Sequence, residues 1–237
     1  MNVVVASSPL QVPYCCCTKS LSKKRNPKCV ASASGATCLV IDDTIQGQAS
    51  TSIETPKTQS VTARRLILLR HAKSSWENRS IRDHDRPLSR AGQLDAIKVS
   101  QKLLQLGWIP ELILSSDALR TRETLKIMQE QVQAFLEAEI HFISSFYSVA
   151  AMDGQTAEHL KQAICKYSRD GILTVMCMGH NRGWEEAASM LSGVSVELKT
   201  CNAALLEATG KSWEEAFSLA GPGGWKLQGL VKPDTAV

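Results

Sequence analysis

Leu66-Ile67-Leu68-Leu69-Arg70-His71 is an uninterrupted apolar run that ends in an arginine and a histidine. Such a run is typical of a strand buried on both faces of a sheet. Arg70 and His71 then fall at the end of the strand, on the rim of the sheet. Arginine carries a planar set of N–H donors that matches a phosphate, and histidine can act as a nucleophile near neutral pH. The pair predicts covalent phosphoryl transfer through His71, provided that other segments complete the site.

Strand and helix signals alternate along the chain after this run. We expect strands at 112–115, 140–143, 173–178, 203–206 and 225–231, and helices at about 89–106, 118–135, 156–167 and 183–191. Ser89 is placed to cap the first helix and Gly107 to end it. The alternation predicts an α/β fold, a three-layer sandwich whose mostly parallel central sheet is flanked by helices.

Reactive side chains follow three of the predicted strands. Arg70 and His71 follow the first, Arg120 comes shortly after the strand at 112–115, and His180 follows the strand at 173–178. Ligands of open α/β sheets bind beyond the carboxyl ends of the strands, so these side chains are expected to meet. Each one alone has an ordinary reading as a surface charge or a turn residue. Together they predict a pocket of two arginines and two histidines.

Four segments resemble the histidine phosphatase superfamily, also called phosphoglycerate mutase-like, and most closely its SixA-like branch of phosphohistidine phosphatases. The segments are LILLRHAKSSW (66–76), DHDRPLSRAGQLDA (83–96), LILSSDALRTRET (112–124) and TVMCMGHNRGWEE (174–186). The similarity extends from about Arg65 to Lys232. The resemblance implies the phosphoglycerate mutase-like fold and a reaction that needs no metal and no organic cofactor.

The resemblance also assigns roles to single residues. It implies that His71 is the nucleophile that becomes phosphohistidine, that Arg70 and Arg120 hold the phosphoryl oxygens, and that His180 completes the pocket. Asn181 directly follows His180, and from this position we expect it to orient the turn or to contact phosphate. Lys73 and Ser74, just past the nucleophile, either touch the substrate or belong to a solvated loop. The remaining N–H of His71 is expected to bond a backbone carbonyl.

Two departures from the family pattern bear on the substrate. Ala72 stands where the common motif has glycine, and residues 145–151 contain no acid where many members place a proton donor; Asp153 reads better as a helix cap. Without a general acid, labile phosphoramidates, acyl phosphates or phenyl phosphates are favoured. We therefore expect a phosphatase acting on a phosphomonoester or phosphoramidate, with protein phosphohistidine as one candidate. The alternatives are a small-molecule phosphatase or mutase, and a non-catalytic module that binds a phosphorylated ligand.

The first 41 residues hold five basic residues, no acid and many hydroxyl side chains. This composition is typical of an organelle transit peptide, and the scarcity of arginine favours the chloroplast stroma over the mitochondrion. We expect residues 1–62 to be transit peptide and linker, and residues 63–237 to form the catalytic domain. From residue 61 onward the chain has 21 basic and 20 acidic residues, and no apolar run approaches the ~18 residues of a membrane span. We expect neither nucleic acid nor a membrane as a partner, but a phosphorylated small molecule or a phosphohistidine protein.

Overall fold

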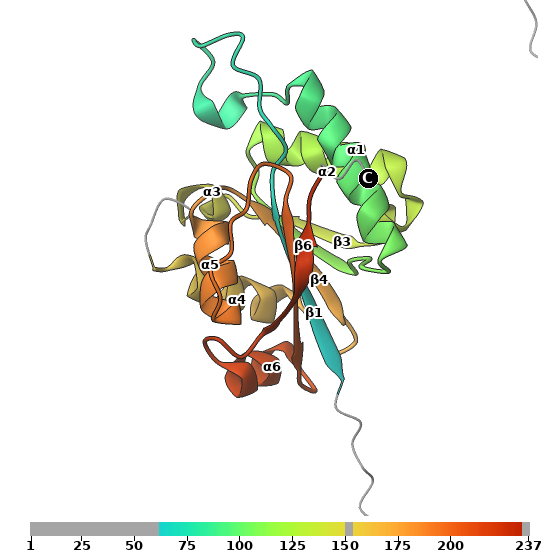
Figure 1. Cartoon of the computed structure of the whole chain (residues 1–237), viewed down its shortest axis with the longest axis vertical. Helices are drawn as coiled ribbons and strands as arrows, with labels where there is room; N and C mark the ends of the chain where they lie inside the picture. The colour runs from blue at the N-terminus through green and yellow to red at the C-terminus, as the bar shows by residue number, and fades with distance from the viewer. Residues whose placement is uncertain (1–61, 150–153, 234–237) are drawn as a thin grey trace, which may run out of the picture. The chain divides into compact units, whose positions relative to one another are not determined.

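The structure, a computed structural model, describes residues 62–149 and 154–233 (Figure 1). Nearly all of the predicted transit peptide and linker, and Asp153, lie outside the described residues. The elements follow in this order: β1 (Ala63–Arg70), the 3-10 turn η1 (Asp83–Asp85), α1 (Arg90–Gln105), β2 (Leu112–Ser115), α2 (Leu119–Gln131), the 3-10 turn η2 (Gln133–Leu136), β3 (Glu139–Phe142), α3 (Ser145–Val149), α4 (Thr156–Tyr167), β4 (Thr174–Gly179), α5 (Gly183–Ser192), β5 (Ala203–Thr209), α6 (Trp213–Ala220) and β6 (Lys226–Val231).

The strands form one six-stranded sheet in the order β3-β2-β4-β1-β5-β6. The strands β1, β4, β2 and β3 pair in parallel, whereas β5 runs antiparallel to both of its neighbours. Helices α1 and α2 lie on one side of the sheet, and α4, α5 and α6 lie on the other (Figure 1). The predicted three-layer sandwich with a mostly parallel sheet is therefore confirmed.

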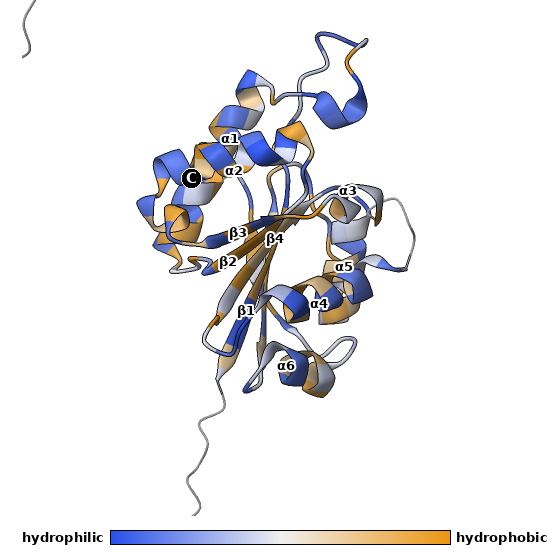
Figure 2. Ribbon diagram, turned by 180° about the vertical axis from the view of Figure 1, so that it is seen from behind, coloured by the Kyte–Doolittle hydropathy of each residue, from blue (hydrophilic) through white to orange (hydrophobic). Residues whose placement is uncertain are grey.

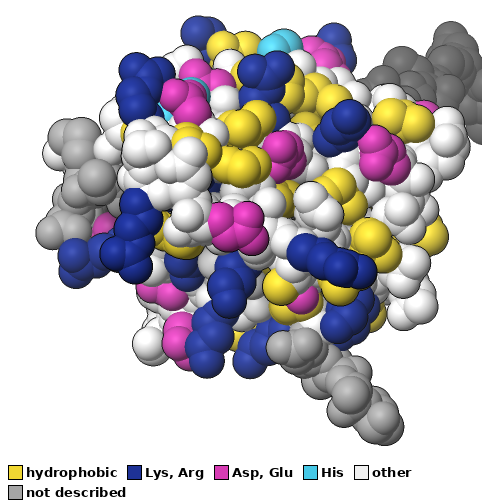
Figure 3. Space-filling view, turned by 90° about the horizontal axis from the view of Figure 1, so that it is seen from above, with side chains coloured by type: hydrophobic (Ala, Val, Ile, Leu, Met, Phe, Trp, Pro, Cys, Tyr) yellow, Lys and Arg dark blue, Asp and Glu magenta, His cyan; other side chains and the backbone are white. Residues whose placement is uncertain are grey.

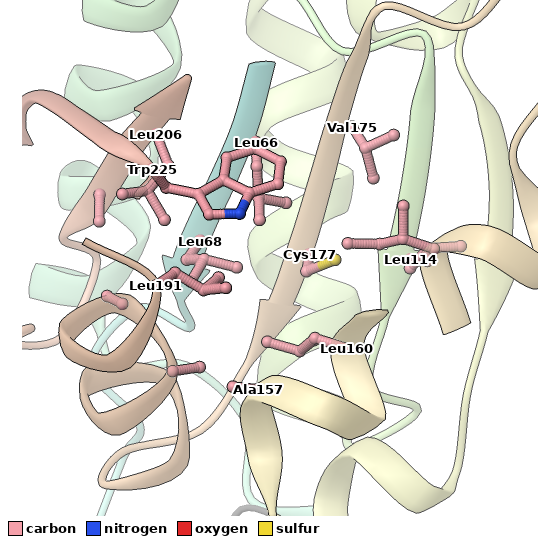
Figure 4. Close-up of a cluster of buried hydrophobic side chains, with 14 of the residues drawn as sticks. Leu66, Leu68, Leu114, Ala157, Leu160, Val175, Cys177, Leu191, Leu206 and Trp225 are labelled. Carbon is pink, nitrogen blue, oxygen red and sulfur yellow. The ribbon is translucent and has the colours of Figure 1, made fainter. Parts of the chain in front are cut away.

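Side chains of β1 alternate between two hydrophobic cores. Leu66 and Leu68 pack with residues of α4, α5 and α6, and Ile67 and Leu69 pack with residues of α1 and α2. All four are fully buried. Figure 2 shows the apolar strands between two layers of helices, and Figure 4 shows the first core, where Trp225 lies over β1. Because both faces are covered, no position of β1 between Leu66 and Leu69 faces water, which explains the unbroken apolar run.

The register of β1 against β4 brings the ends of these two strands together. Arg70 pairs with Gly179, and the backbone N–H of His71 donates to the carbonyl of Gly179 at 3.0 Å. His71 and His180 are thus the first residues beyond two hydrogen-bonded parallel strands. Strand β2 pairs with the other side of β4, up to Ser115 opposite Met178, so its end reaches the same edge.

Two short helices, α3 and α6, were not predicted, because segments of five and eight residues are shorter than the window over which a helical pattern can be recognised. The helix expected at 118–135 is divided at Val132, whose backbone is extended and which separates α2 from η2. Ser89 caps α1 as predicted, since its side chain accepts a hydrogen bond from the N–H of Gly92. Among the described residues, no helix is long and apolar enough to cross a membrane.

Gly92 should not tolerate a side chain, because α1 lies directly against the backbone that follows His71. A Cβ added at Gly92 would lie 2.2 Å from the carbonyl oxygen of Lys73. We expect Gly92→Ala to lower the free energy of unfolding by about 1–3 kcal/mol, although alanine favours helix. Urea denaturation of the full chain measures this change. Gly171→Ala is the control, because nothing lies within 4 Å of that position; equal stability of the two variants would contradict the account.

Candidate active site

His71 is held in one tautomer by the backbone. Its Nδ1 lies 2.7 Å from the carbonyl oxygen of Ala72, and a carbonyl can only accept, so Nδ1 carries the proton. This confirms the predicted backbone contact. The other nitrogen, Nε2, faces the guanidinium of Arg120, whose Nε–H donates to it at 3.1 Å. The lone pair of Nε2 is therefore directed toward a cation in the pocket, and His71 as a residue is 7% exposed.

His180 is fixed in the opposite tautomer. Its Nδ1 lies 3.2 Å from a terminal nitrogen of Arg120, and since arginine can only donate, Nδ1 is the acceptor. The proton is then on Nε2, which donates to the hydroxyl of Ser116 at 2.8 Å. The rings of His71 and His180 are tilted, with centroids 5.1 Å apart. The two histidines therefore present lone pairs to the same guanidinium.

Arg120, in the first turn of α2, is the centre of the site. Besides the two histidines, its guanidinium contacts the backbone carbonyl of Asp83 at 2.5 Å and the carboxylate of the same residue at 2.9 Å. Arg120 is only 6% exposed, so its charge is poorly screened by water. The hydroxyl of Tyr147, a residue of α3, donates to the Asp83 carboxylate at 2.9 Å and so links α3 to these contacts.

The surroundings keep both histidines neutral. Burial lowers the pKa of His71 to about 4; the hydrogen bond to Ala72 opposes this shift, and the charge of Arg120 adds to it. Burial, the neighbouring His71 and Arg120 lower the pKa of His180 to about 3. Both values lie well below the ordinary histidine pKa of about 6.5. At neutral pH each ring keeps the lone pair that a nucleophile or acceptor needs.

A carboxylate that the sequence analysis did not place in the pocket, that of Asp83, lines the cavity. The acid comes from η1 and not from residues 145–151. Partial burial would raise its pKa, but the hydrogen bond from Tyr147 and the charge of Arg120 outweigh burial and lower the pKa below its ordinary value. Asp83 is therefore ionised at neutral pH and has no proton to donate. The site holds a carboxylate, and among the described lining residues it still has no protonated carboxylic acid.

A cavity of about 530 Å³ opens beside Arg120. Its lining contains three of the four predicted catalytic residues, together with Asn181. The lining residues are His71, Asp83, Arg120, Tyr147, Ser148, His180, Asn181 and Arg182. Arg70, Lys73 and Ser74 are not among them. The Arg70 guanidinium donates to the carbonyl of Leu198 at 2.8 Å. Lys73 accepts from Ser89 through its backbone, and Ser74 forms an isolated β-bridge with Leu88. The structure thus uses Lys73 and Ser74 to hold the loop after His71 and does not bring them to the cavity.

Backbone strain marks two further residues of the site. Among the described residues, the non-glycine residues with positive φ are Arg182, at 56°, and Cys201, at 61°. Arg182 lines the cavity two residues after His180, and the N–H of Cys201 donates to the carbonyl of His71 at 3.0 Å. Such conformations cost energy and are concentrated at functional sites. Sequence reasoning missed both residues, because a side chain gives no sign of an unfavourable φ.

Sequence reasoning also missed Asp83 and Tyr147, and it placed Ser116 at the end of a strand without giving it a role. Asp83 stands at the start of a segment that resembles the family, but the resemblance assigned it no role. In the described part of the chain, no cluster of three or more histidine, cysteine or acidic side chains could hold a metal ion. On the face seen from above in Figure 3, basic, acidic and hydrophobic side chains are interspersed.

Comparison with known proteins defines the class of this site. Residues 66–167 match the model of the histidine phosphatase superfamily (branch 1). An uncharacterised chloroplastic protein of Arabidopsis thaliana is 71% identical over 175 residues, covering 74% of this chain and 80% of that protein. The chain belongs to the histidine phosphatase superfamily, whose members are phosphatases or mutases.

Solved structures agree with this assignment. A proposed phosphohistidine phosphatase SixA of Agrobacterium tumefaciens is 25% identical, with a TM-score of 0.55 over 72% of this chain and 99% of its own. Its counterpart from Nakamurella multipartitia shares the fold, with a TM-score of 0.59 and 24% identity over 73% of this chain and 98% of its own. The similarity to the Agrobacterium protein, together with the family model, supports the SixA-like branch that the four motifs indicated.

We expect the two site histidines to stay neutral in solution down to about pH 5, because their pKa values lie near 4 and 3. Proton–nitrogen NMR of the full chain should show His71 protonated on Nδ1 and His180 on Nε2. His84 is the internal control: hydrogen bonds to Asp117 and Asp85 raise its pKa above the ordinary value. Variants that replace each histidine with glutamine assign the signals, and a His71 signal that titrates at pH 6.5 or above would refute the described electrostatics.

Proposed function

We propose that this protein is a phosphatase that forms a covalent phosphohistidine on His71. The observation that carries the proposal is the neutral His71 ring, with one N–H fixed on the Ala72 carbonyl and its Nε2 lone pair facing the buried Arg120. A nucleophile of this kind is useful only toward an electrophile that the guanidinium also binds. A phosphoryl group meets both conditions.

The reaction proceeds in two displacements. Nε2 of His71 attacks phosphorus, the bond to the leaving group breaks, and the leaving group departs with the electron pair. Water then attacks the same phosphorus, the P–N bond breaks, the electron pair returns to Nε2, and the proton of the water passes to solvent or phosphate. Arg120 and the neutral His180 stabilise the charge on the phosphoryl oxygens during both steps.

Arg70 fits the role of the second phosphate ligand. Its Nε is buried and has no hydrogen-bond partner within the described residues, although a terminal nitrogen bonds Leu198. A buried N–H without a partner is costly, and a phosphoryl oxygen beside His71 would satisfy it. This unpartnered donor supports Arg70 as a phosphate ligand, although Arg70 is not among the residues that line the cavity.

The ionised state of Asp83 narrows the substrate. A carboxylate without a proton cannot assist an alkoxide leaving group, which needs a general acid. Imidazole, aryl oxide and carboxylate leaving groups need less help. We therefore propose a labile substrate, with a phosphohistidine protein as the leading candidate and a phosphorylated small molecule as the other. The same reasoning disfavours a sugar-phosphate mutase.

We further propose that the protein acts in the chloroplast stroma. The support is the basic, acid-free leader of this chain and the chloroplastic assignment of the Arabidopsis relative. The mitochondrial alternative has no such support.

Turnover should depend on His71 and on the leaving group. With the full chain, we expect hydrolysis of a phosphoramidate and an aryl phosphate, and a loss of at least about a thousandfold in His71→Gln. An alkyl phosphate should react at least about a hundredfold more slowly than the aryl phosphate. Rapid quenching at alkaline pH, where phosphohistidine survives, should trap the phosphoryl group on His71 of the wild type.

The control for this experiment is His159→Gln, because His159 contacts Ser145 and does not line the cavity. Turnover that survives in His71→Gln would exclude His71 as the nucleophile. Phosphate binding without turnover in the wild type would instead identify a non-catalytic binding module.

The leader should direct a passenger protein into plastids. Residues 1–62 fused to a fluorescent protein should accumulate inside chloroplasts, because the basic, hydroxyl-rich composition is typical of a transit peptide. Confocal microscopy and protease protection of isolated chloroplasts measure the import. The fluorescent protein fused to residues 63–237 is the control and should stay outside; import of that control, or exclusion of the leader fusion, would contradict the assignment.

A further inference from the structure

Arg120 has few hydrogen-bond donors left for a substrate. A guanidinium has five N–H groups. Four contacts use the Arg120 donors in the free protein: His71 Nε2, His180 Nδ1, the Asp83 carbonyl and the Asp83 carboxylate. Bidentate binding of a phosphate needs two parallel N–H groups. A phosphoryl group can therefore gain two bonds from Arg120 only if it displaces one of these contacts.

The Asp83 carboxylate is the contact that most resembles the ligand. Like a phosphoryl group, it presents anionic oxygens to a terminal nitrogen of Arg120, at 2.9 Å. Its side chain is 51% exposed, whereas that of Arg120 is 8% exposed, so the carboxylate approaches the cation from the open side of the cavity. The hydroxyl of Tyr147 and the more distant Arg86, whose Nε lies 3.8 Å from the carboxylate, hold it in place.

We propose that Asp83 is an internal anion that competes with phosphate for Arg120 and thereby sets the affinity of the pocket for oxyanions. The proposal rests on the proposed role of Arg120 as a phosphate ligand. While Asp83 occupies Arg120, the two charges offset each other, and an entering dianion meets a carboxylate beside the guanidinium. When the phosphoryl group is bound, Asp83 must give up its bond to Arg120 or share it, and the repulsion remains.

This arrangement has a direct consequence for the product. Inorganic phosphate presents the same kind of oxyanion as the substrate but lacks the leaving group. It therefore has no contacts outside the phosphate pocket that could offset the competition from Asp83. The competition from the carboxylate therefore removes a larger share of the binding free energy of phosphate than of a substrate that makes additional contacts. Asp83 favours release of phosphate from a buried cationic site.

The experiment measures oxyanion binding directly. Inorganic phosphate and tungstate are titrated into the full chain by calorimetry, for the wild type, Asp83→Asn and Asp85→Asn. Asp85 lies in the same 3-10 turn, and Asp85→Asn changes the net charge by the same amount as Asp83→Asn. The Asp85 carboxylate, however, bonds Arg82 and His84 and not Arg120, so this variant controls for net charge alone. We expect Asp83→Asn to lower the dissociation constant at least about tenfold, and Asp85→Asn to change it less than about twofold.

Unchanged or weaker binding by Asp83→Asn would overturn the proposal, because it would show that the carboxylate orients Arg120 and does not compete. Equal tightening by Asp83→Asn and Asp85→Asn would also overturn it, since net charge alone would then explain the effect. Asp83→Ser, which removes the charge with a smaller side chain, should bind tighter as well and replaces the asparagine variant if that protein does not fold. Binding needs no turnover: a chain that lacks phosphatase activity but shows the tighter binding would refute the proposed function and leave this inference standing.

Discussion

The parallel register between β1 and β4 is the constraint on which the rest of the structure depends. Arg70 lies opposite Gly179, so the residues that follow them, His71 and His180, leave the sheet side by side. A shift of one residue would turn Leu66 and Leu68 toward the wrong core and would separate the two imidazoles. The hydrophobic burial of β1 on both faces therefore also fixes the relative position of the two reactive rings. The stability of the core and the geometry of the site have the same physical origin.

The site must keep its histidines neutral beside a permanent cation. Burial is the larger cause of the lowered pKa values, and Arg120 adds to it. Arginine cannot lose its proton and cannot accept a hydrogen bond, so each imidazole nitrogen that faces it must be an acceptor. The Ala72 carbonyl and the Ser116 hydroxyl then hold the two remaining N–H groups. Charge and hydrogen bonding thus specify one tautomer for each ring.

The sequence was sufficient for the parts of the fold that repeat a pattern. Apolar runs located β1, β2 and β4, and the rule that ligands bind beyond strand ends brought Arg120 and His180 to His71. Asp83 and Tyr147 could not be found in this way, because they come from a 3-10 turn and a five-residue helix whose positions depend on contacts made after folding. Nearness in sequence also suggested two residues that the structure does not bring to the cavity. Lys73 and Ser74 come shortly after His71, but their backbone pairs with the segment before α1.

In the free site, Arg120 contacts both His71, the proposed nucleophile, and Asp83, the proposed competing anion. The Nε–H of Arg120 engages the lone pair of His71, while its terminal nitrogens engage Asp83. In the proposed reaction, a phosphoryl group takes a terminal donor of Arg120 from Asp83 and lies beside the Nε–H that contacts His71. Because the ionised Asp83 has no proton to offer, the rate of the proposed reaction would depend on how readily the P–X bond breaks, which is the physical reason for proposing a labile substrate.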